Sequence, residues 1–238
     1  NHIERNETDS VSSFTSLNYS TSFKDRGSAV GLRGGFIYRF NDWFRAGISA
    51  MIPLDYSINR TYNASISSQT IEGKKEFEAP EGTSSYRIKQ TSRFTASGAL
   101  TIKKRGILSL DYETVNYPGI RLRDEQGSYD NENDYIRSNY RFTGNLRLGG
   151  ELRFDENYIR AGFQLIGNPK KDLSQGSDVR VYSIGAGYRN EDFYVDAAYL
   201  LSMQKGSFTP YSTKLAYTEL ASLNIARHSF LLTVGTRF

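Results

Sequence analysis

The chain has 238 residues, a formal net charge of +4 and no cysteine. Without cysteine it has neither a disulfide framework nor a thiolate metal site. No apolar run approaches the roughly 20 residues of a transmembrane helix, which excludes a helical membrane protein but not a β-barrel, whose strands are only half apolar. The positive charges are spread along the chain without a Lys/Arg block, so we expect no nucleic-acid partner.

Apolar and polar side chains alternate along most of the chain, after a first predicted strand at residues 11–23. In residues 44–54 the even positions are apolar, and residues 141–154 repeat this pattern more sharply. In residues 158–165 the odd positions are the apolar ones. Segments of about ten residues with a period of two are typical of strands that have lipid on one side and water on the other. Further segments of this kind lie at 94–104, 108–112, 182–188 and 193–203.

The last predicted strand, residues 230–238, has the same alternation and ends on an aromatic residue. Outer-membrane β-barrels commonly end in this way, because the last strand closes against the first and is read by the insertion machinery. We therefore predict a periplasmic C-terminus. The predicted barrel-closing signal consists of Phe230, Leu232, Val234 and Phe238.

Short and long connections between the predicted strands alternate strictly from Gly27 onward. The short turns fall at 41–42, 105–106, 155–157 and 190–192. The long polar connections fall at 59–86, 118–140, 168–178 and 204–222. Barrels sort their loops by length in this way, with tight periplasmic turns and long extracellular loops, whereas a soluble sandwich has no reason to do so. The sequence therefore predicts an all-β fold, a transmembrane antiparallel β-barrel of about ten strands.

Several stretches agree with a known pattern in order and spacing. Residues 31–49 combine a glycine-rich strand, a Tyr-containing strand end, a turn before Trp and an Arg-x-Gly strand start, and Ile52-Pro53-Leu54 follows. Residues 110–117 are acidic and Tyr-rich, and residues 147–163 form a hairpin that precedes Asn168-Pro169. Together they resemble the FadL/TodX-type family of outer-membrane transporters for long-chain fatty acids and other hydrophobic compounds.

The resemblance implies a fourteen-stranded barrel with an N-terminal hatch in the outer membrane of a Gram-negative-type bacterium. We expect residues 1–238 to form a single domain, the C-terminal part of such a barrel, without the hatch and the early strands. It also implies passive uptake of hydrophobic small molecules, such as long-chain fatty acids, without a cofactor. The implied partners are that ligand, membrane lipids, the outer-leaflet glycolipid and proteins of an outer-membrane complex. No ligand-binding residue carries over, because the family's lateral opening and hatch contacts lie in the absent part.

Charged side chains of both signs fall on the face opposite the apolar set. Arginines there would attract a carboxylate headgroup as a selectivity lining. Alternatively, opposite charges pair across strands as a structural network, an interpretation that the mixed signs favour. The predicted lumen-lining residues are Arg33, Arg45, Asp55, Arg141, Arg147, Glu151, Arg153, Arg160 and Asp196, together with Arg39, Asp111, Glu113, Gln164 and Arg189.

Two long connections have a distinctive composition. One carries apolar side chains that would rim a hydrophobic access site, although packing of the loop against itself explains them equally well: Phe208, Tyr211, Leu215 and Tyr217. The other, residues 124–134, is acidic, but its spacing does not match that of an EF-hand. We interpret it as a solvated loop and expect no metal site.

Catalysis finds no support in the sequence. The two histidines are His2 and His228, and by parity with Phe230 the second faces lipid near the extracellular interface. No nucleophile elbow, zinc-protease motif or phosphate loop is present. We therefore predict that the protein is not an enzyme. Besides a transporter, the sequence allows a structural or partner-binding barrel within a larger assembly, or a non-selective porin.

Overall fold

The computed structural model describes residues 2–8, 14–53, 55–103, 105–124, 129–173, 176–208 and 221–236, with backbone only at 2–8, 14, 15 and 208. Its internal contacts divide the chain into two compact units. Unit 1 comprises Asn1–Val30, Leu54–Gln90 and Arg121–Glu132, and unit 2 comprises Gly31–Pro53, Thr91–Ile120 and Asn133–Phe238. Within the described residues, no helix has both the length and the apolar composition needed to cross a bilayer.

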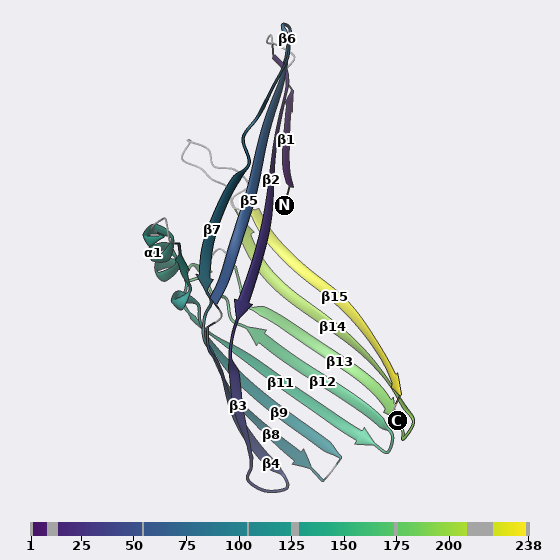
Figure 1. Cartoon of the computed structure of the whole chain (residues 1–238). Helices are drawn as coiled ribbons and strands as arrows, with labels where there is room; N and C mark the ends of the chain where they lie inside the picture. Colours follow the sequence, from purple (N-terminus) through teal and green to yellow (C-terminus); the bar gives the residue numbers. More distant parts are fainter. Residues whose placement is uncertain are drawn as a thin grey trace. The chain divides into compact units, whose positions relative to one another are not determined.

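Unit 2 is built on a nine-stranded sheet in which every neighbouring pair is antiparallel (Figure 1). The strands follow one another across the sheet in chain order. From one edge to the other they are β3 (Arg33–Arg39), β4 (Phe44–Met51), β8 (Arg93–Ile102), β9 (Gly106–Asn116), β11 (Phe142–Phe154), β12 (Asn157–Ile166), β13 (Val179–Arg189), β14 (Phe193–Phe208) and β15 (Ala221–Thr236).

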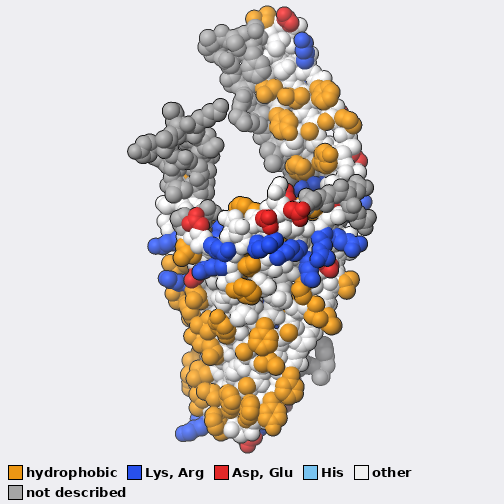
Figure 2. Space-filling model, turned by 90° about the vertical axis from the view of Figure 1, so that its left-hand side faces the viewer, with side chains coloured by type: hydrophobic (Ala, Val, Ile, Leu, Met, Phe, Trp, Pro, Cys, Tyr) orange, Lys and Arg blue, Asp and Glu red, His pale blue; other side chains and the backbone are white. Residues whose placement is uncertain are grey.

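The strand register confirms the predicted sorting of side chains. Leu148 lies opposite Leu110 and Phe163, whereas its neighbour Arg147 lies opposite Asp111 and Gln164. Because directly opposite residues share a face, one face of the sheet collects the apolar set and the other collects the charged set. We call these the outward face and the inner face. Hydrophobic side chains gather over the part of the molecule that the strands of unit 2 form (Figure 2).

The tight turns of unit 2 are set by their own side chains. The Oδ1 atom of Asn41 accepts hydrogen bonds from the backbone amides of Trp43 and Phe44, at 3.0 and 2.7 Å. Asn190 repeats this Asx arrangement with Asp192 and Phe193, at 3.0 and 2.8 Å. An Asn side chain that replaces a backbone acceptor favours a sharp reversal.

The other two tight turns contain a residue with positive φ. These residues are Lys103, with φ of 46°, and Asp155, with φ of 53°. The four predicted short turns are therefore confirmed.

Unit 1 is a second antiparallel sheet that the sequence did not predict. Its path is β1-β2-β5-β7-β10, and β6 pairs with β5. The strands are β1 (His2–Thr8), β2 (Phe14–Val30), β5 (Asp55–Thr70), β6 (Gly73–Glu78), β7 (Gly82–Lys89) and β10 (Arg121–Arg123).

Two expectations are wrong in this region. The first predicted strand, residues 11–23, ends too early, because β2 stays paired with β5 up to Val30. The connection 59–86 is not a loop, since the alternation of Tyr56, Ile58, Tyr62 and Ile66 continues along β5 beyond Arg60. The connection 118–140 contains the helix α1 (Asp130–Asn139), with Asp130 and Glu132 in its first turn and Arg137 in its last. This charge order suits the helix dipole.

Arg60 joins three strands of unit 1. Its Nε and Nη2 atoms donate to the two carboxylate oxygens of Asp25 at 2.7 and 2.9 Å. Its guanidinium lies 5.5 Å from the ring centre of Phe23 and 5.7 Å from that of Tyr86. The hydrogen bond from Arg60 lowers the pKa of Asp25 below its ordinary value of 3.8. Both side chains are solvent-exposed, so the pair fixes register more than it adds stability.

Leu148 follows Arg147 in β11 and lies on the outward face. We predict that Leu148→Arg destabilises the membrane-inserted protein by about 2–4 kcal/mol, because the new charge faces hydrocarbon near the middle of the strand. Ser109→Arg places the same side chain on the inner face and should have a much smaller effect. Reversible denaturant titration in lipid vesicles measures both. Equal losses for the two variants would show that the faces are assigned wrongly.

We also predict that Arg60→Gln raises the pKa of Asp25 to its ordinary value. The carboxyl chemical shift of isotopically labelled aspartate, recorded against pH, measures this pKa. Because the folded pKa is lowered, the stabilising contribution is complete above the ordinary pKa and is lost as pH falls through the lowered one. The control Arg26→Gln removes the neighbouring charge and should leave the titration unchanged. A titration that Arg60→Gln does not shift would contradict the assignment.

Candidate functional site

The inner face of unit 2 has a polar interior. Glu113 is 6 % exposed and Asn145 is 5 % exposed, whereas Phe230 on the outward face is 82 % exposed. A soluble protein has the opposite arrangement, since large apolar side chains avoid water and carboxylates seek it. This inversion places lipid against the outward face and water or ligand against the inner face.

The first inner-face group is centred on Glu113, and we call it the Glu113 cluster. The Oε1 atom of Glu113 accepts a hydrogen bond from Asn145 Nδ2 at 2.8 Å and from Arg147 Nη2 at 3.4 Å. Arg93 Nη1 lies 3.8 Å from the same oxygen. The amide of Asn145 in turn accepts from the backbone N of Gly167 at 3.1 Å. The buried carboxylate therefore has two cationic partners and one amide donor, which offsets its desolvation.

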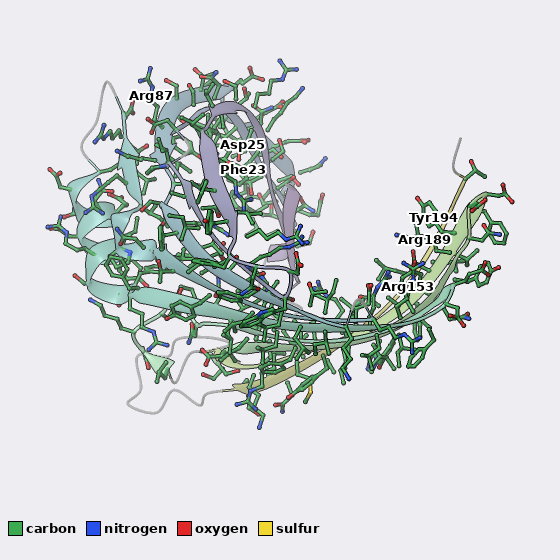
Figure 3. All side chains as sticks on the ribbon, turned by 90° about the horizontal axis from the view of Figure 1, so that it is seen from below. Phe23, Asp25, Arg87, Arg153, Arg189 and Tyr194 are labelled. Carbon is green, nitrogen blue, oxygen red and sulfur yellow. The ribbon has the colours of Figure 1, made fainter. Side chains whose placement is uncertain are left out.

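The second group surrounds Tyr158, which is 6 % exposed, and we call it the Tyr158 cluster. Arg153, Arg160 and Arg189 each place the guanidinium 5.4 Å from the ring centre of Tyr158. One aromatic ring thus contacts three cations, an arrangement stabilised by attraction of each cation to the ring. Arg153 and Arg189 lie with Tyr194 on the concave side of the curved sheet (Figure 3).

Two carboxylates balance these arginines in part. Arg160 Nε donates to Glu151 Oε2 at 2.6 Å, and its Nη1 donates to Asp196 Oδ1 at 2.7 Å. Arg189 Nη2 lies 3.8 Å from Asp196 Oδ2. Three arginines against two carboxylates leave one net positive charge. In addition, the buried Nε of Arg189 has no hydrogen-bond partner within the described part of the chain.

A groove of about 710 Å³ borders the Tyr158 cluster. Glu151, Arg160 and Asp196 line its polar side. Small side chains in neighbouring strands make room for it, and a Cβ on Gly162 would lie only 2.6 Å from Ser183 Oγ. The inner-face residues that line the rest of the groove are Ile107, Ser109, Gly149, Gly162, Ser183, Gly185, Ala198, Leu200, Leu231 and Thr233. Its volume and its mostly apolar walls with a few polar groups at one side are typical of small-molecule sites.

The structure brings together most of the predicted lumen residues. Arg147 joins the Glu113 cluster, and Glu151, Arg153, Arg160 and Asp196 join the Tyr158 cluster. Arg33 and Arg45 lie on the inner face of β3 and β4 and line a second hollow of about 600 Å³ together with Asp111.

Two predicted lumen residues do not join them. Asp55 begins β5 in unit 1 and lies opposite Lys89. Pro53 cannot donate a ladder hydrogen bond, so the alternation of β4 ends before Pro53 and does not extend to Asp55. Arg141 precedes β11, and its Nε donates to the backbone oxygen of Asn168 at 3.0 Å.

The remaining predicted residues are those of the barrel-closing signal and of the access loop. Phe230, Leu232 and Val234 lie on the outward face of β15 and are exposed, whereas Phe238 lies outside the described residues. Of the access loop, Tyr211, Leu215 and Tyr217 also lie outside them, and so does the side chain of Phe208. The access-loop interpretation stays a prediction.

Sequence reasoning missed Tyr158, Tyr194, Arg93 and Asn145. Parity alone places all four on the inner face, so the signal was present. Tyr158, Tyr194 and Asn145 carry no formal charge, and Arg93 lies one residue before the predicted strand 94–104. Groups of three or more metal-ligating side chains are absent from the described residues. His228 Nδ1 lies 2.7 Å from Tyr199 Oη on the outward face, as its parity predicted.

The solved structures that resemble this chain include three with a TM-score above 0.5. The CymD monoaromatic hydrocarbon channel has a TM-score of 0.53 and 16% sequence identity, over 94% of this chain. A Pseudomonas aeruginosa FadL homologue has 0.52 and 13%, and the P. putida toluene transporter TodX has 0.53 and 13%, each over 92% of this chain. The chain has the fold of a FadL-type β-barrel.

The likeness to the FadL/TodX-type family seen in the sequence is thus confirmed for the fold. The chain spans 56% of the CymD structure, 74% of the FadL homologue and 53% of TodX. No protein-family model and no curated protein matches the sequence.

We predict that Arg160→Gln destabilises the FadL-type barrel by about 1–2 kcal/mol, because Glu151 and Asp196 lose their shared partner while staying partly desolvated. Arg45→Gln is the matched control, since it removes an inner-face arginine for which the described residues show no ion pair. Denaturant titration in vesicles compares the two. A loss no larger for Arg160→Gln than for Arg45→Gln would show that the Tyr158 cluster contributes nothing to stability.

Proposed function

We propose that the protein lets hydrophobic small molecules pass across the bacterial outer membrane without a cofactor. The fold supports this, because the similar solved structures carry the names of a monoaromatic hydrocarbon channel and a toluene transporter. The sorted faces of unit 2 support it as well, since an apolar outward face and a polar inner face suit a wall between lipid and lumen.

The groove beside the Tyr158 cluster carries the proposal. Ile107, Leu200 and Leu231 give it apolar contacts within an otherwise polar inner face. A hydrophobic molecule gains free energy by leaving water for such a surface, at about 25 cal/mol per Å². The charged side chains beside the groove limit its apolar surface to a short stretch. A hydrophobic molecule therefore contacts apolar side chains only locally and is able to dissociate.

The substrate class follows from the same groove. Apolar walls accept a hydrocarbon such as an aromatic ring or an alkyl chain. The net positive charge of the adjoining Tyr158 cluster also suits a carboxylate. Long-chain fatty acids therefore fit the site, and so do uncharged hydrocarbons.

The orientation belongs to the proposal. Short turns would face the periplasm and long connections the exterior, as in other outer-membrane barrels, which makes the C-terminus periplasmic. The long connection that carries Phe208, Tyr211, Leu215 and Tyr217 would then meet the substrate first. In this orientation membrane lipids cover the outward face. Protein partners in an outer-membrane complex remain a prediction.

We predict that Ser183→Trp lowers uptake of a labelled fatty acid or toluene severalfold in liposomes that contain the full-length protein, because the ring fills the groove. Ser49→Trp adds the same side chain to the inner face of β4, outside the groove, and should leave uptake near that of the unchanged protein. Circular dichroism and heat-modified gel mobility verify that both variants fold.

The reverse order of the two variants would place the route at the second hollow. Uptake no faster than in empty vesicles, with folded protein present, would remove the transport proposal in favour of a structural or partner-binding barrel. A large steady ion current in planar bilayers would indicate a non-selective porin instead.

A further inference from the structure

The outward face of unit 2 carries two strongly basic side chains in its nine described strands, Arg180 and Lys205, and no carboxylate. A Lys or Arg that faces lipid costs about 2–4 kcal/mol at the bilayer midplane but about 0–1 kcal/mol near the interface. Both lie near the long-connection ends of their strands. Their position therefore marks the level of the lipid headgroups.

The two cations are neighbours on adjacent strands. Arg180 of β13 lies opposite Met203 of β14, and Lys205 follows Met203 by two positions on the same face. Such diagonal neighbours are about 7–8 Å apart. In the described residues no carboxylate forms an ion pair with either side chain.

A groove of about 500 Å³ runs between these side chains and also receives Arg141. Its floor is apolar, formed by Leu173, Tyr182, Met203 and Ala226 among others. One carboxylate, Asp178, lines it against three cations. The groove thus combines a net positive rim with an apolar base.

Hydrogen bonds fix the walls of this groove. Asn168, 7 % exposed, donates its backbone N–H to Asp178 Oδ1 at 2.8 Å and its Nδ2 to the backbone oxygen of Gly176 at 2.9 Å. The Asn168 backbone oxygen holds Arg141 Nε at 3.0 Å. Ser177 Oγ accepts from the backbone N of Lys205 at 2.9 Å, and the Ser177 N–H donates to the Lys205 oxygen at 2.8 Å. The wall is therefore organised without a ligand.

We propose that this groove binds a phosphorylated glycolipid of the outer leaflet, with phosphate against Arg141, Arg180 and Lys205 and an acyl chain along the apolar floor. Arginine and lysine are strong phosphate partners, and the apolar floor suits a lipid rather than a free anion. Three cations against one carboxylate leave two net positive charges, which suits a headgroup with two phosphates better than a single phosphodiester. The assignment to the outer leaflet rests on the orientation in the proposed function, but it does not depend on transport.

The test measures binding to the full-length protein in detergent micelles by native mass spectrometry. The probes are a bisphosphorylated lipid A disaccharide, its dephosphorylated form and phosphatidylglycerol. We expect the double variant Arg180→Gln/Lys205→Gln to bind the bisphosphorylated probe roughly tenfold to thirtyfold more weakly, since each basic residue near an anionic lipid raises the affinity about fivefold. The control Lys103→Gln/Arg105→Gln removes the same charge at the short-turn end and should keep the original affinity.

Several results would overturn the proposal. Equal binding of the phosphorylated and dephosphorylated probes would show that phosphate is not recognised. Unchanged binding by the Arg180→Gln/Lys205→Gln variant would place the lipid elsewhere. Phosphatidylglycerol that binds as tightly as the glycolipid would remove the outer-leaflet assignment. Uptake in the liposome assay is read separately, so failure of one proposal leaves the other measurable.

Discussion

A strand that lies in a bilayer has to pair all of its backbone groups, and it presents apolar side chains to lipid on one face only. The absence of water makes each unpaired amide or carbonyl cost several kcal/mol, so regular pairing is imposed along the whole strand. With pairing fixed, the pleat sends alternate side chains to opposite faces, and a slip by one residue would turn Arg147 and Glu151 toward hydrocarbon. The polar clusters, the groove and the apolar outward face of unit 2 all depend on this register.

The alternation of side chains between the two faces also explains why charged residues on the inner face form ion pairs. Charges that cannot face lipid collect on one side, where they lie about 5 Å from cross-strand neighbours. Opposite charges such as Arg160 and Asp196 then bind one another, and Tyr158 fills the space between three guanidinium groups. Small residues such as Gly149 and Gly162 interrupt this packing, and the apolar groove opens where they do.

Because the register is periodic, much of unit 2 could be predicted from the sequence: nine of the strands, the tight turns and the faces of Arg147, Glu151 and Asp196. At two of the predicted lumen residues the period gives no information. Pro53 interrupts the ladder before Asp55, so counting by twos across it is invalid. Arg141 lies outside a strand and is directed by its bond to Asn168. Most of β2 was predicted as the first strand, but the other strands of unit 1 were missed. Ser, Thr and Asn are frequent in β5, and a strand rich in polar residues is hard to distinguish from a loop by its sequence.

The direction of the edge strands limits how the sheet is completed. In the described part of the chain, β3 and β15 each pair with one neighbour. Eight antiparallel steps separate them, so both run from the long-connection end to the short-turn end. If they paired with each other the contact would be parallel, which an antiparallel barrel does not use. An antiparallel closure therefore needs an odd number of further strands between β15 and β3, and nine plus an odd number gives the even count of bacterial barrels. Five such strands would make fourteen.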